Sequence, residues 1–246
     1  MRQLLAFSLA LCLAVPAMAD KLLIATATNF RPALADISRS FQSETGHLVA
    51  ISSASTGILY NQILHGAPFH ILLAADTERP ELLERSGHVV PASRFTYAWG
   101  KLVLVYRDNL ASLAKAGIGA VLQSPGLELV IANPEHAPYG RAAAAVLKRY
   151  PPAANQRLLR AANVGQAYQM WFSGGAGAAL VALSSAPAQY LKVPSSWYPP
   201  LQQQAVLLQR GAELEAATQF LQYLRSPGAQ NIIRKHGYAT EAPTHG

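Results

Sequence analysis

The feature of the sequence that most constrains the fold is a regular alternation of short apolar runs with segments of helical periodicity. The first run is Leu22–Ala25, and the segment after it carries apolar side chains at the spacing of one helix face, at Leu34, Ile37 and Phe41. Leu48–Ile51 is the next apolar run. Such alternation is typical of βαβ units, whose strands lie parallel. The pattern therefore predicts an α/β fold of mostly parallel sheets flanked by helices.

The alternation continues along the rest of the chain, with glycine and proline between the segments. Further strands are predicted at 69–74, 102–106, 127–132, within 174–183, and at 205–208. Further helices are predicted at 58–65, 80–86, 141–150, 213–224 and 228–236, with another that ends at 171. A proline-punctuated stretch at 194–200 is short enough for a crossover connection.

Residues 1–19 carry the three parts of a cleaved export signal. Arg2 supplies a positive start, a short apolar run follows, and residues 16–19 end in the small side chains that signal peptidase accepts. The alternative is a membrane anchor, but a spanning helix needs about 20 apolar residues, more than this run offers. We therefore expect cleavage after Ala19 and an exported chain that begins at Asp20.

Cysteine usage excludes several kinds of site. The single cysteine, Cys12, lies inside the predicted signal, and Leu11 before it is too large for a lipoprotein signal. The exported chain therefore has no cysteine, which excludes disulfides, thiolate catalysis and cysteine-bound zinc or iron–sulfur clusters.

Composition and charge limit the classes of partner that the protein is expected to bind. Hydrophobic residues make up 51% of the sequence, yet no later apolar run reaches membrane-spanning length, as expected of a soluble globular protein. The formal net charge of +7 gives a weak long-range attraction for anions. Nucleic acid is not expected as a partner, because the basic residues are scattered and form no stripe with interleaved aromatic side chains.

Three predicted strand ends run into hydroxyl or amide residues just before a helix, at Thr28–Asn29, Ser52–Thr56 and Pro138–Gly140. In open α/β sheets ligands bind at the carboxyl ends of strands, beside helix N-termini whose free N–H groups attract anions. Ser, Thr and Asn side chains add neutral donors. A simpler explanation is helix capping, which stabilises by about 1 kcal/mol per cap. Three such loops favour a ligand, but both interpretations stay open.

Signatures of catalysis and of nucleotide or metal binding are missing. The sequence has no Gly-x-Gly-x-x-Gly, Walker A or Gly-x-Ser-x-Gly motif. Asp76 could act as a general base and Ser184 as a nucleophile, but both fit helix capping better. His65 and His70 flank a turn and are interpreted as surface residues rather than metal ligands. We therefore expect no catalysis, no bound metal ion and no cofactor.

Several segments share their order and spacing with a known family. They are Ala27–Phe30, Ser52–Gly57, Gly66–Pro68, Ala74–Asp76 and Asn133–Gly140, with a less specific tail at 220–227 and 236–238. Through them the sequence resembles the periplasmic molybdate-binding proteins, which have the type II solute-binding fold. The resemblance covers essentially the whole exported chain, and no single segment carries it alone.

The first loop, with its Thr-Asn-Phe sequence, resembles the Azotobacter-type branch of that family more than the commoner Ala-Ser-Leu type. In that branch the oxyanion is held by the first-loop Thr and Asn, a second-loop hydroxyl, a third-loop Tyr and a backbone amide before a helix. The resemblance implies that the ligand-binding residues here are Thr28, Asn29, Thr56, Tyr139 and Val164, with Ser55 as the neighbouring candidate for the second-loop hydroxyl.

Two positions depart from the family pattern. His70 stands where many members have Asp or Asn, and Leu183 stands where others place a ligand-binding Tyr. The second departure makes Tyr139 the main aromatic donor and leaves fine selectivity open.

The implied ligand suits the donors that these loops offer. Molybdate is fully deprotonated near neutral pH, so its oxygens only accept hydrogen bonds. A pocket of N–H and O–H donors fits that ion without a basic residue, because aligned dipoles in a dry cleft attract an anion. A phosphate site must also accept from a protonated ligand and would need an Asp or Glu.

The resemblance implies a two-lobed clamp with hinge crossings, in which residues 20–99 and 203–246 form one lobe and 100–202 the other. It implies a monomeric periplasmic protein that captures molybdate, and also tungstate, and delivers it to the membrane permease of an ABC transporter. The alternatives are a sulfate- or phosphate-binding protein, and an exported hydrolase that uses Asp76 or Ser184.

Overall fold

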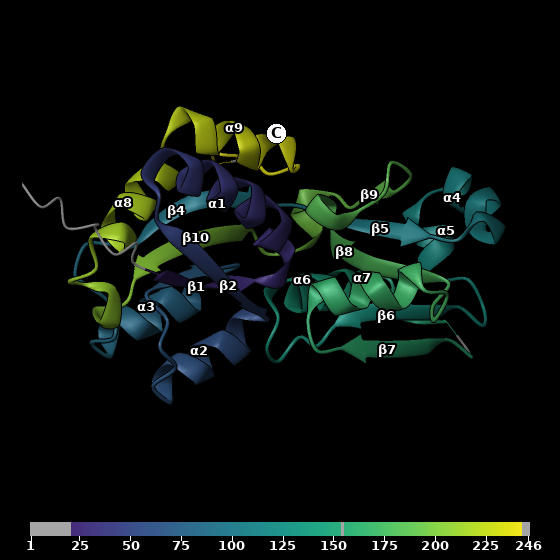
Figure 1. Ribbon diagram of the computed structural model, residues 1–246. Coiled ribbons are helices and arrows are strands. Elements are labelled where there is room, and N and C mark those ends of the chain that lie inside the picture. Colours follow the sequence, from purple (N-terminus) through teal and green to yellow (C-terminus); the bar gives the residue numbers. More distant parts are fainter. Residues whose placement is uncertain (1–20, 154, 243–246) are drawn as a thin grey trace, which may run out of the picture.

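The computed structural model describes residues 21–153 and 155–242, which form two α/β halves side by side (Figure 1). Each half has a five-stranded sheet with helices packed against it. The predicted signal, with Cys12, and the predicted start at Asp20 lie outside the described residues. Within the described ranges, no helix is both long and apolar enough to cross a membrane.

The elements follow one another in an irregular alternation of strands and helices. The strands are β1 (Lys21–Ala27), β2 (Leu48–Ala54), β3 (Ile71–Ala74), β4 (Phe95–Gly100), β5 (Leu102–Tyr106), β6 (Glu128–Ala132), β7 (Arg157–Ala161), β8 (Ala178–Ala182), β9 (Leu191–Lys192) and β10 (Leu201–Leu207). The α-helices are α1 (Arg31–Thr45), α2 (Thr56–Leu64), α3 (Glu78–Arg85), α4 (Ala111–Ala116), α5 (Ile118–Leu122), α6 (Pro138–Arg149), α7 (Val164–Phe172), α8 (Glu215–Leu224) and α9 (Pro227–Lys235). Short 3-10 helices are η1 (Thr28–Phe30), η2 (Asp108–Leu110), η3 (Leu183–Ser185), η4 (Ser195–Trp197) and η5 (Gln209–Gly211).

Each sheet has a parallel part and an antiparallel part. In the first sheet, ordered β2-β1-β3-β10-β4, β1 runs parallel to β2 and β3, whereas β10 runs antiparallel to β3 and β4. In the second, ordered β7-β6-β8-β5-β9, β6 runs parallel to β7 and β8, whereas β5 runs antiparallel to β8 and β9. The sheets are therefore mixed rather than mostly parallel. Strands β5 and β10 arrive from the opposite half, so no crossover helix forces them to lie parallel.

The first sheet is covered on both faces, and the residues of β1 alternate between them. Leu22 and Ile24 belong to the core shared with α1, α8 and α9, where Phe41 and Phe220 pack edge to face. Ala25 belongs to the core on the opposite face, under α2 and α3. Figure 1 shows these two groups of helices on either side of the sheet. The alternation follows from the two-residue period of a strand.

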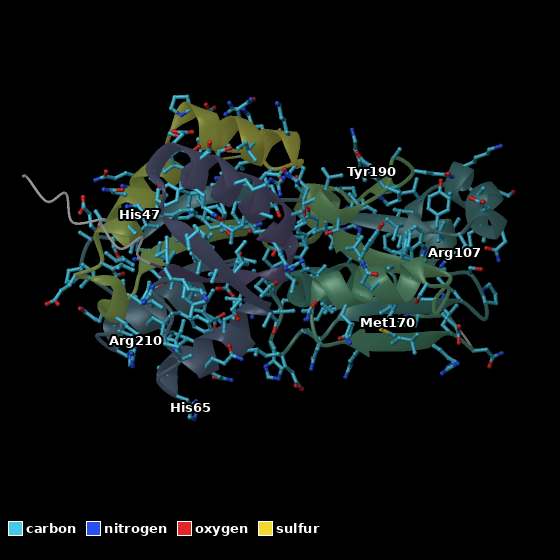
Figure 2. All side chains as sticks on the ribbon, viewed as in Figure 1. His47, His65, Arg107, Met170, Tyr190 and Arg210 are labelled. Atoms are coloured by element: carbon cyan, nitrogen blue, oxygen red, sulfur yellow. The ribbon has the colours of Figure 1, made fainter. Side chains whose placement is uncertain are left out.

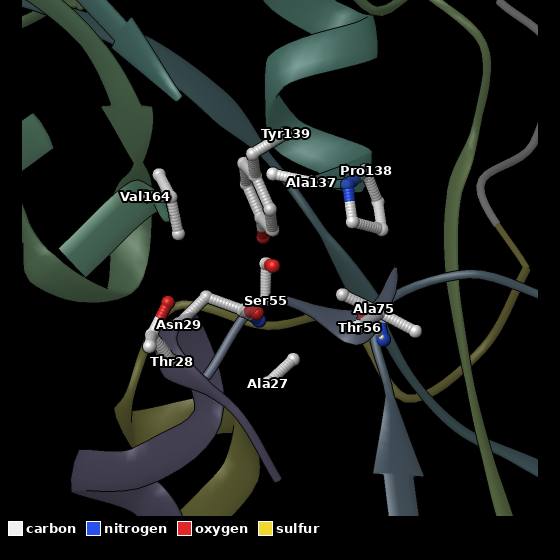
Figure 3. A pocket seen from close by; sticks show the side chains of 10 residues that line it. All are labelled: Ala27, Thr28, Asn29, Ser55, Thr56, Ala75, Ala137, Pro138, Tyr139 and Val164. Carbon is white, nitrogen blue, oxygen red and sulfur yellow. Dashed lines mark hydrogen bonds between the residues drawn. The ribbon is translucent and has the colours of Figure 1, made fainter. Parts of the chain in front are cut away.

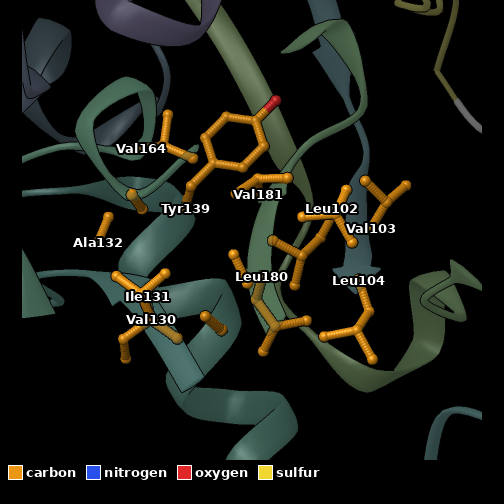
Figure 4. Close-up of a cluster of buried hydrophobic side chains, with 14 of the residues drawn as sticks. Leu102, Val103, Leu104, Val130, Ile131, Ala132, Tyr139, Val164, Leu180 and Val181 are labelled. Atoms are coloured by element: carbon orange, nitrogen blue, oxygen red, sulfur yellow. The ribbon is translucent and has the colours of Figure 1, made fainter. Parts of the chain in front are cut away.

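The second half has one continuous core formed by β5, β6, β8 and the helices around them. Figure 4 shows its central side chains, among them Leu104, Val130 and Leu180. The ring of Tyr139 and the side chain of Val164 belong to the same cluster. The core of the second half therefore extends to the first turns of α6 and α7.

Two crossings join the halves. The chain leaves the first sheet at Gly100 and enters the second at Leu102. It returns between Lys192 and Leu201, through the proline-punctuated stretch.

Strands β4 and β7 were not predicted from the sequence. β7 is an edge strand with an exposed arginine at each end of a two-leucine run, at Arg157 and Arg160. β4 mixes Thr, Tyr and Trp and is only partly buried. Neither segment has the apolar run that identified the other strands, because edge strands bury less of their surface.

Candidate functional site

A small pocket lies between the two halves, where strand ends of both sheets face one another (Figure 3). The space between its walls, with its mouth included, is about 180 Å³. All six residues predicted to bind a ligand line this pocket, together with four apolar neighbours: Thr28, Asn29, Ser55, Thr56, Tyr139 and Val164, and then Ala27, Ala75, Ala137 and Pro138. None of these lining residues is charged.

The first wall comes from the ends of two neighbouring strands. β1 and β2 pair parallel, with Ala27 opposite Ala54, so the loops that follow them lie side by side. After β1 the chain turns into η1, which carries Thr28 and Asn29. After β2 it enters α2, with Ser55 as the N-cap residue. The sheet register therefore brings the first two predicted loops together.

The second wall repeats this arrangement with β6 and β7. These strands also pair parallel, with Ala132 opposite Ala161, and helices begin shortly after each of them. α6 begins at Pro138 and α7 begins at Val164. The pocket thus collects the N-terminal ends of α2, α6 and α7, whose free N–H groups and dipoles favour an anion.

The hydroxyls of the first wall do not cap helices. Ser55 is almost wholly buried, its side chain makes no capping hydrogen bond, and its Oγ has no partner among the described residues. Thr56 is fully buried, and its Oγ1 accepts a hydrogen bond from the N–H of Ala75 at 3.0 Å. The Thr56 hydroxyl therefore keeps its own proton for another acceptor. Buried hydroxyls are normally paired, so the Ser55 Oγ is a hydrogen-bonding group at the pocket that the described residues leave unused.

The side-chain NH₂ group of Asn29 was the expected donor to the pocket, but the structure uses it elsewhere. Its Nδ2 donates to Gln203 Oε1 at 2.9 Å and to the hydroxyl of Tyr238 at 3.0 Å, so both amide hydrogens are used inside the protein. Its backbone N–H has no hydrogen-bond partner in the described part of the chain. The donor that Asn29 can offer the pocket is therefore the backbone N–H, whereas its buried Oδ1 has no partner among the described residues and can only accept.

The phenol of Tyr139 reaches the pocket from the first turn of α6. Figure 3 shows its hydroxyl and that of Ser55 pointing toward one another. Burial, with the neighbouring Tyr238 adding to it, raises the pKa of Tyr139 well above its usual value of 10.0. The phenol therefore stays protonated at neutral pH and acts as a neutral donor.

The start of α7 adds backbone donors. The N–H of Gly165 donates to Thr28 Oγ1 at 3.3 Å, which links the two walls. The N–H of Val164 has no partner among the described residues. Asn163 is the helix cap here, since its Oδ1 accepts from the N–H of Gln166 at 2.8 Å. Asn163 thus caps the helix, and the N–H of its neighbour Val164 is left to donate to the pocket.

The two halves are in direct contact next to the pocket. The N–H of Gly57 donates to the carbonyl of His136 at 2.9 Å, and a Cβ at Gly57 would lie only 2.9 Å from that oxygen. Glycine therefore permits this close approach. Beside it, Arg141 of α6 forms an ion pair with Asp76 at 2.7 Å. The structure thus describes a conformation with the two halves in contact.

Asp76 has one partner besides Arg141, namely Arg79, which contacts it through two groups. Its Oδ1 accepts from the N–H of Arg79 at 3.2 Å, a bond to the first turn of α3, although the N-cap position itself is Thr77 and not Asp76 as predicted. Its Oδ2 pairs with the guanidinium of Arg79 at 3.0 Å. The carboxylate is therefore held by two arginines and does not line the pocket.

Three further sequence candidates lie outside the pocket. Ser184 does not cap a helix: its Oγ donates to the carbonyl of Asn29 at 3.0 Å and accepts from Tyr238 at 2.9 Å. His70 is half-buried rather than a surface residue, and its Nδ1 accepts from the N–H of Leu23 at 3.1 Å. Burial, with a contribution from Arg210, lowers the pKa of His70. His65 is exposed at the end of α2 (Figure 2). The described residues hold no cluster of three metal-ligating side chains.

Three residues that surround the site were not predicted from the sequence: Gly100, Gln203 and Tyr238. Gln203 is fully buried and Tyr238 nearly so, and both bond to Asn29. Gln203 lies in a run of three glutamines just before the strand predicted at 205–208, and Gln204 beside it is buried as well. The sequence alone does not tell which of the three faces inward.

Comparison with known proteins gives consistent matches over nearly the whole chain. The family described as bacterial extracellular solute-binding protein matches residues 22–239. The molybdate-binding protein ModA of Rhodobacter capsulatus is 39% identical over 96% of this chain and 95% of its own length. The molybdate-binding protein ModA of Azotobacter vinelandii is 40% identical over 93% of this chain and 94% of its own.

Solved structures agree with these matches. The periplasmic molybdate-binding protein of Azotobacter vinelandii superposes with a TM-score of 0.80 at 36% identity, covering 90% of this chain and 100% of that one. The sulfate-binding protein SubI of Mycobacterium tuberculosis shares the fold, with a TM-score of 0.72 at 16% identity over 91% of this chain and 88% of that one. The chain therefore belongs to the bacterial extracellular solute-binding proteins, in the same family as the ModA proteins of Rhodobacter capsulatus and Azotobacter vinelandii.

Proposed function

We propose that this protein captures molybdate between its two halves and delivers it to the membrane permease of an ABC transporter, without catalysing a reaction. The observation that carries the proposal is a pocket whose walls offer hydroxyls and backbone N–H groups but no charged side chain. The most specific feature of this pocket is the buried Oγ of Ser55, which has no partner among the described residues. The relatives named molybdate-binding proteins support the same ligand.

The chemistry of the donors narrows the ligand class. A fully deprotonated tetrahedral ion presents only acceptors, which the phenol of Tyr139, the hydroxyl of Thr56 and the N–H of Val164 can satisfy. Tungstate presents the same acceptors, and we expect it to bind as well. Sulfate does too, and it is the alternative in this class, since the sulfate-binding SubI shares the fold. Hydrogen phosphate carries a proton that needs an acceptor, and no carboxylate lines the pocket.

A ligand that contacts both halves would explain a role in transport, because its binding would close the protein. We propose lobes of residues 20–99 with 203–246, and 100–202, that close about the two crossings. An ion that bonds to Thr56 in one lobe and Tyr139 in the other binds the closed state better than the open one, and so shifts the equilibrium toward closure. A permease can then distinguish loaded from empty protein. We further propose that the protein is a periplasmic monomer without a cofactor, released by cleavage after Ala19.

Calorimetric titration of the purified protein with molybdate, tungstate, sulfate and phosphate tests the ligand. We expect molybdate and tungstate to bind and phosphate not to bind, and tighter binding of sulfate than of molybdate would favour the alternative in this class. Because the ligand binds the folded form, molybdate at a hundred times Kd should stabilise the protein by about 2.7 kcal/mol, visible as a raised Tm. Tight binding of phosphate alone, or of no oxyanion, would refute the assignment.

The competing proposal is an exported hydrolase that uses Asp76 or Ser184. The hydrogen bonds and ion pairs of both residues argue against it, since neither side chain lines the pocket. Turnover of an ester or phosphoester panel at enzyme-like rates, abolished in Ser184→Ala or Asp76→Asn, would overturn the binding proposal.

A further inference from the structure

Behind the pocket lies a fully buried amide side chain, that of Gln203 on β10. It is not among the residues that line the pocket, yet it bonds to two that do. Its Oε1 accepts from Asn29 Nδ2 at 2.9 Å and from the hydroxyl of Tyr97 at 3.1 Å. Its Nε2 donates to the hydroxyl oxygen of Tyr139 at 3.4 Å. One amide therefore links a loop of the first half to the aromatic donor of the second.

The space for this link is provided at the first crossing. A Cβ on Gly100 would lie 2.7 Å from Gln203 Nε2 and would collide with the hydroxyl of Tyr139. Contacts below 3.0 Å are essentially never seen for a Cβ. The absence of a side chain at Gly100 thus lets the phenol and the amide meet.

The direction of these hydrogen bonds decides whether the phenol proton of Tyr139 is available to a ligand. A phenol has one proton, and its oxygen can also accept. Since Gln203 donates to the Tyr139 oxygen, the phenol proton is left free, and the described residues offer it no other partner. Figure 3 shows the hydroxyl directed into the pocket, toward Ser55. The raised pKa of Tyr139 keeps that proton in place.

The orientation of Gln203 is itself imposed from the first half. The Nδ2 of Asn29 donates to the amide oxygen. The hydroxyl of Tyr97 also faces that oxygen, although its single proton can go to the carbonyl of Ala74 at 3.2 Å instead. If the amide turned over, its NH₂ group would meet the NH₂ group of Asn29, and its oxygen would accept the phenol proton of Tyr139. That proton would then be lost to the ligand.

We propose that Gln203 is a positioning residue of the oxyanion site, which holds the phenol of Tyr139 as a donor toward the ligand and so helps to restrict the pocket to ligands that only accept hydrogen bonds. The inference rests on the proposed function, because it names what orients a donor in that same site. Gln203 acts through Tyr139 and not by touching the ligand.

Two substitutions test the direction of the bond. Gln203→Met keeps the volume but removes the amide, and we expect it to raise the Kd for molybdate roughly ten-fold, as for a weakened hydrogen bond to a charged group. In Gln203→Glu the carboxylate can only accept, so it takes the phenol proton and repels the anion. We expect its Kd at pH 8 to exceed that of Gln203→Met.

The pH dependence of Gln203→Glu is the readout that a purely structural role would not move. Burial raises the pKa of such a carboxyl, and once protonated it can again donate to Tyr139. Its molybdate affinity should therefore recover several-fold between pH 8 and pH 6, whereas the wild type and Gln203→Met change little. The other titratable groups around this position are Tyr97, Tyr139 and Tyr238, with Tyr198 close enough to act on Tyr139 and Asp76 on Tyr97. The wild type contains them all.

Gln202→Glu is the matched control, because Gln202 is the adjacent residue on β10 and donates to Thr96 Oγ1 at 2.7 Å instead. It should bind molybdate like the wild type at both pH values. A second control is Tyr139→Phe, in which replacing Gln203 by Met should have little further effect on Kd. Equal effects of Gln203→Met with and without the phenol would overturn the proposal, as would a wild-type Kd in Gln203→Glu at pH 8.

The results distinguish a failure of the proposed function from a failure of the role of Gln203. If the wild type binds no oxyanion, the proposed function fails; if it binds molybdate and the Gln203 variants bind equally well, only the role of Gln203 fails. Should the variants not fold, the side-chain NH₂ resonances of Gln203 in the ¹⁵N-labelled wild type give the answer. They should shift on molybdate addition, and that shift should be lost in Tyr139→Phe. Resonances unaffected by molybdate would contradict the proposal.

Discussion

The two walls of the pocket are built alike but hold their donors differently. Each uses a pair of parallel strands that end side by side, followed by helix N-termini. In the first wall Ser55 and Thr56 are buried, and Thr56 is held by the N–H of Ala75, which belongs to the same half. In the second wall the phenol of Tyr139 is held by Gln203, which belongs to the opposite sheet.

This difference separates preorganised donors from donors that depend on closure. The first wall can present Thr56 whether or not the halves are in contact, because its partner Ala75 lies in the same half. The second wall presents a correctly oriented Tyr139 only when β10 and α6 are together. We therefore infer that the first wall provides the initial binding surface, and that the second wall connects binding to closure.

The largest expected effect is the loss of a first-wall hydroxyl. Thr56→Val keeps the shape but removes the donor, and we expect a ten- to hundred-fold rise in the molybdate Kd, from about 1.5–3 kcal/mol for a hydrogen bond to a charged group. It also leaves the N–H of Ala75 unpaired, so the Tm of the free protein should fall.

Ser55→Ala is the matched control for that prediction. The Ser55 Oγ has no partner among the described residues, so its removal should weaken binding without lowering the Tm. If instead Ser55→Ala lowered the Tm and left the calorimetric Kd unchanged, the capping interpretation would be right and the first wall would not be a binding surface.

The next effect concerns the second wall. Tyr139→Phe removes the phenol donor, and we expect roughly a ten-fold rise in Kd with little change in Tm. Small-angle scattering should show a smaller radius of gyration on molybdate addition in the wild type, and a weaker response in the variant at equal ligand concentration. An unaltered affinity would place the site within the first half and contradict the clamp.

A smaller effect is expected from the ion pair beside the pocket. Arg141→Ala removes the cross-half bond to Asp76, whose carboxylate keeps Arg79 as a partner. A partly exposed pair contributes up to about 1 kcal/mol, so Kd should rise no more than about five-fold. The wild-type Kd should also rise with salt more than that of the variant. Lys148→Ala, an exposed change on the same helix, should have neither effect.

The smallest expected effect concerns His70, which bonds to β1 below the first wall. It is measured on the protein without ligand. The pKa of His70 is lowered from 6.5 in the folded protein, so below about 6.5 the unfolded chain binds more protons there than the folded one. This contribution to stability is complete above the unfolded pKa and is lost as the pH falls below it. The Tm should therefore drop slightly between pH 7.5 and pH 5.5, and His70→Gln should reduce that drop. An equal drop in the variant would assign it to other groups.

Much of the fold could be predicted from local pattern. The apolar periodicity of Leu34, Ile37 and Phe41 identified α1, and the run Leu22–Ala25 identified β1, because burial on a helix face or in a central strand leaves a sequence signal. β4 and β7 carried no such signal, since they are partly exposed. The antiparallel pairing of β10 was hidden for another reason: it depends on where the chain returns from the other half.

The sequence by itself determined which loops carry donors, because hydroxyl residues placed between a strand and a helix are a local pattern. Thr28, Ser55, Thr56 and Tyr139 were all accessible in this way, and the structure gathers them around one pocket. The tertiary structure decided the direction in which those donors point. Gln203 lies 64 residues from Tyr139 along the chain, and hydrogen-bond direction depends on partners that come together only when both sheets have formed.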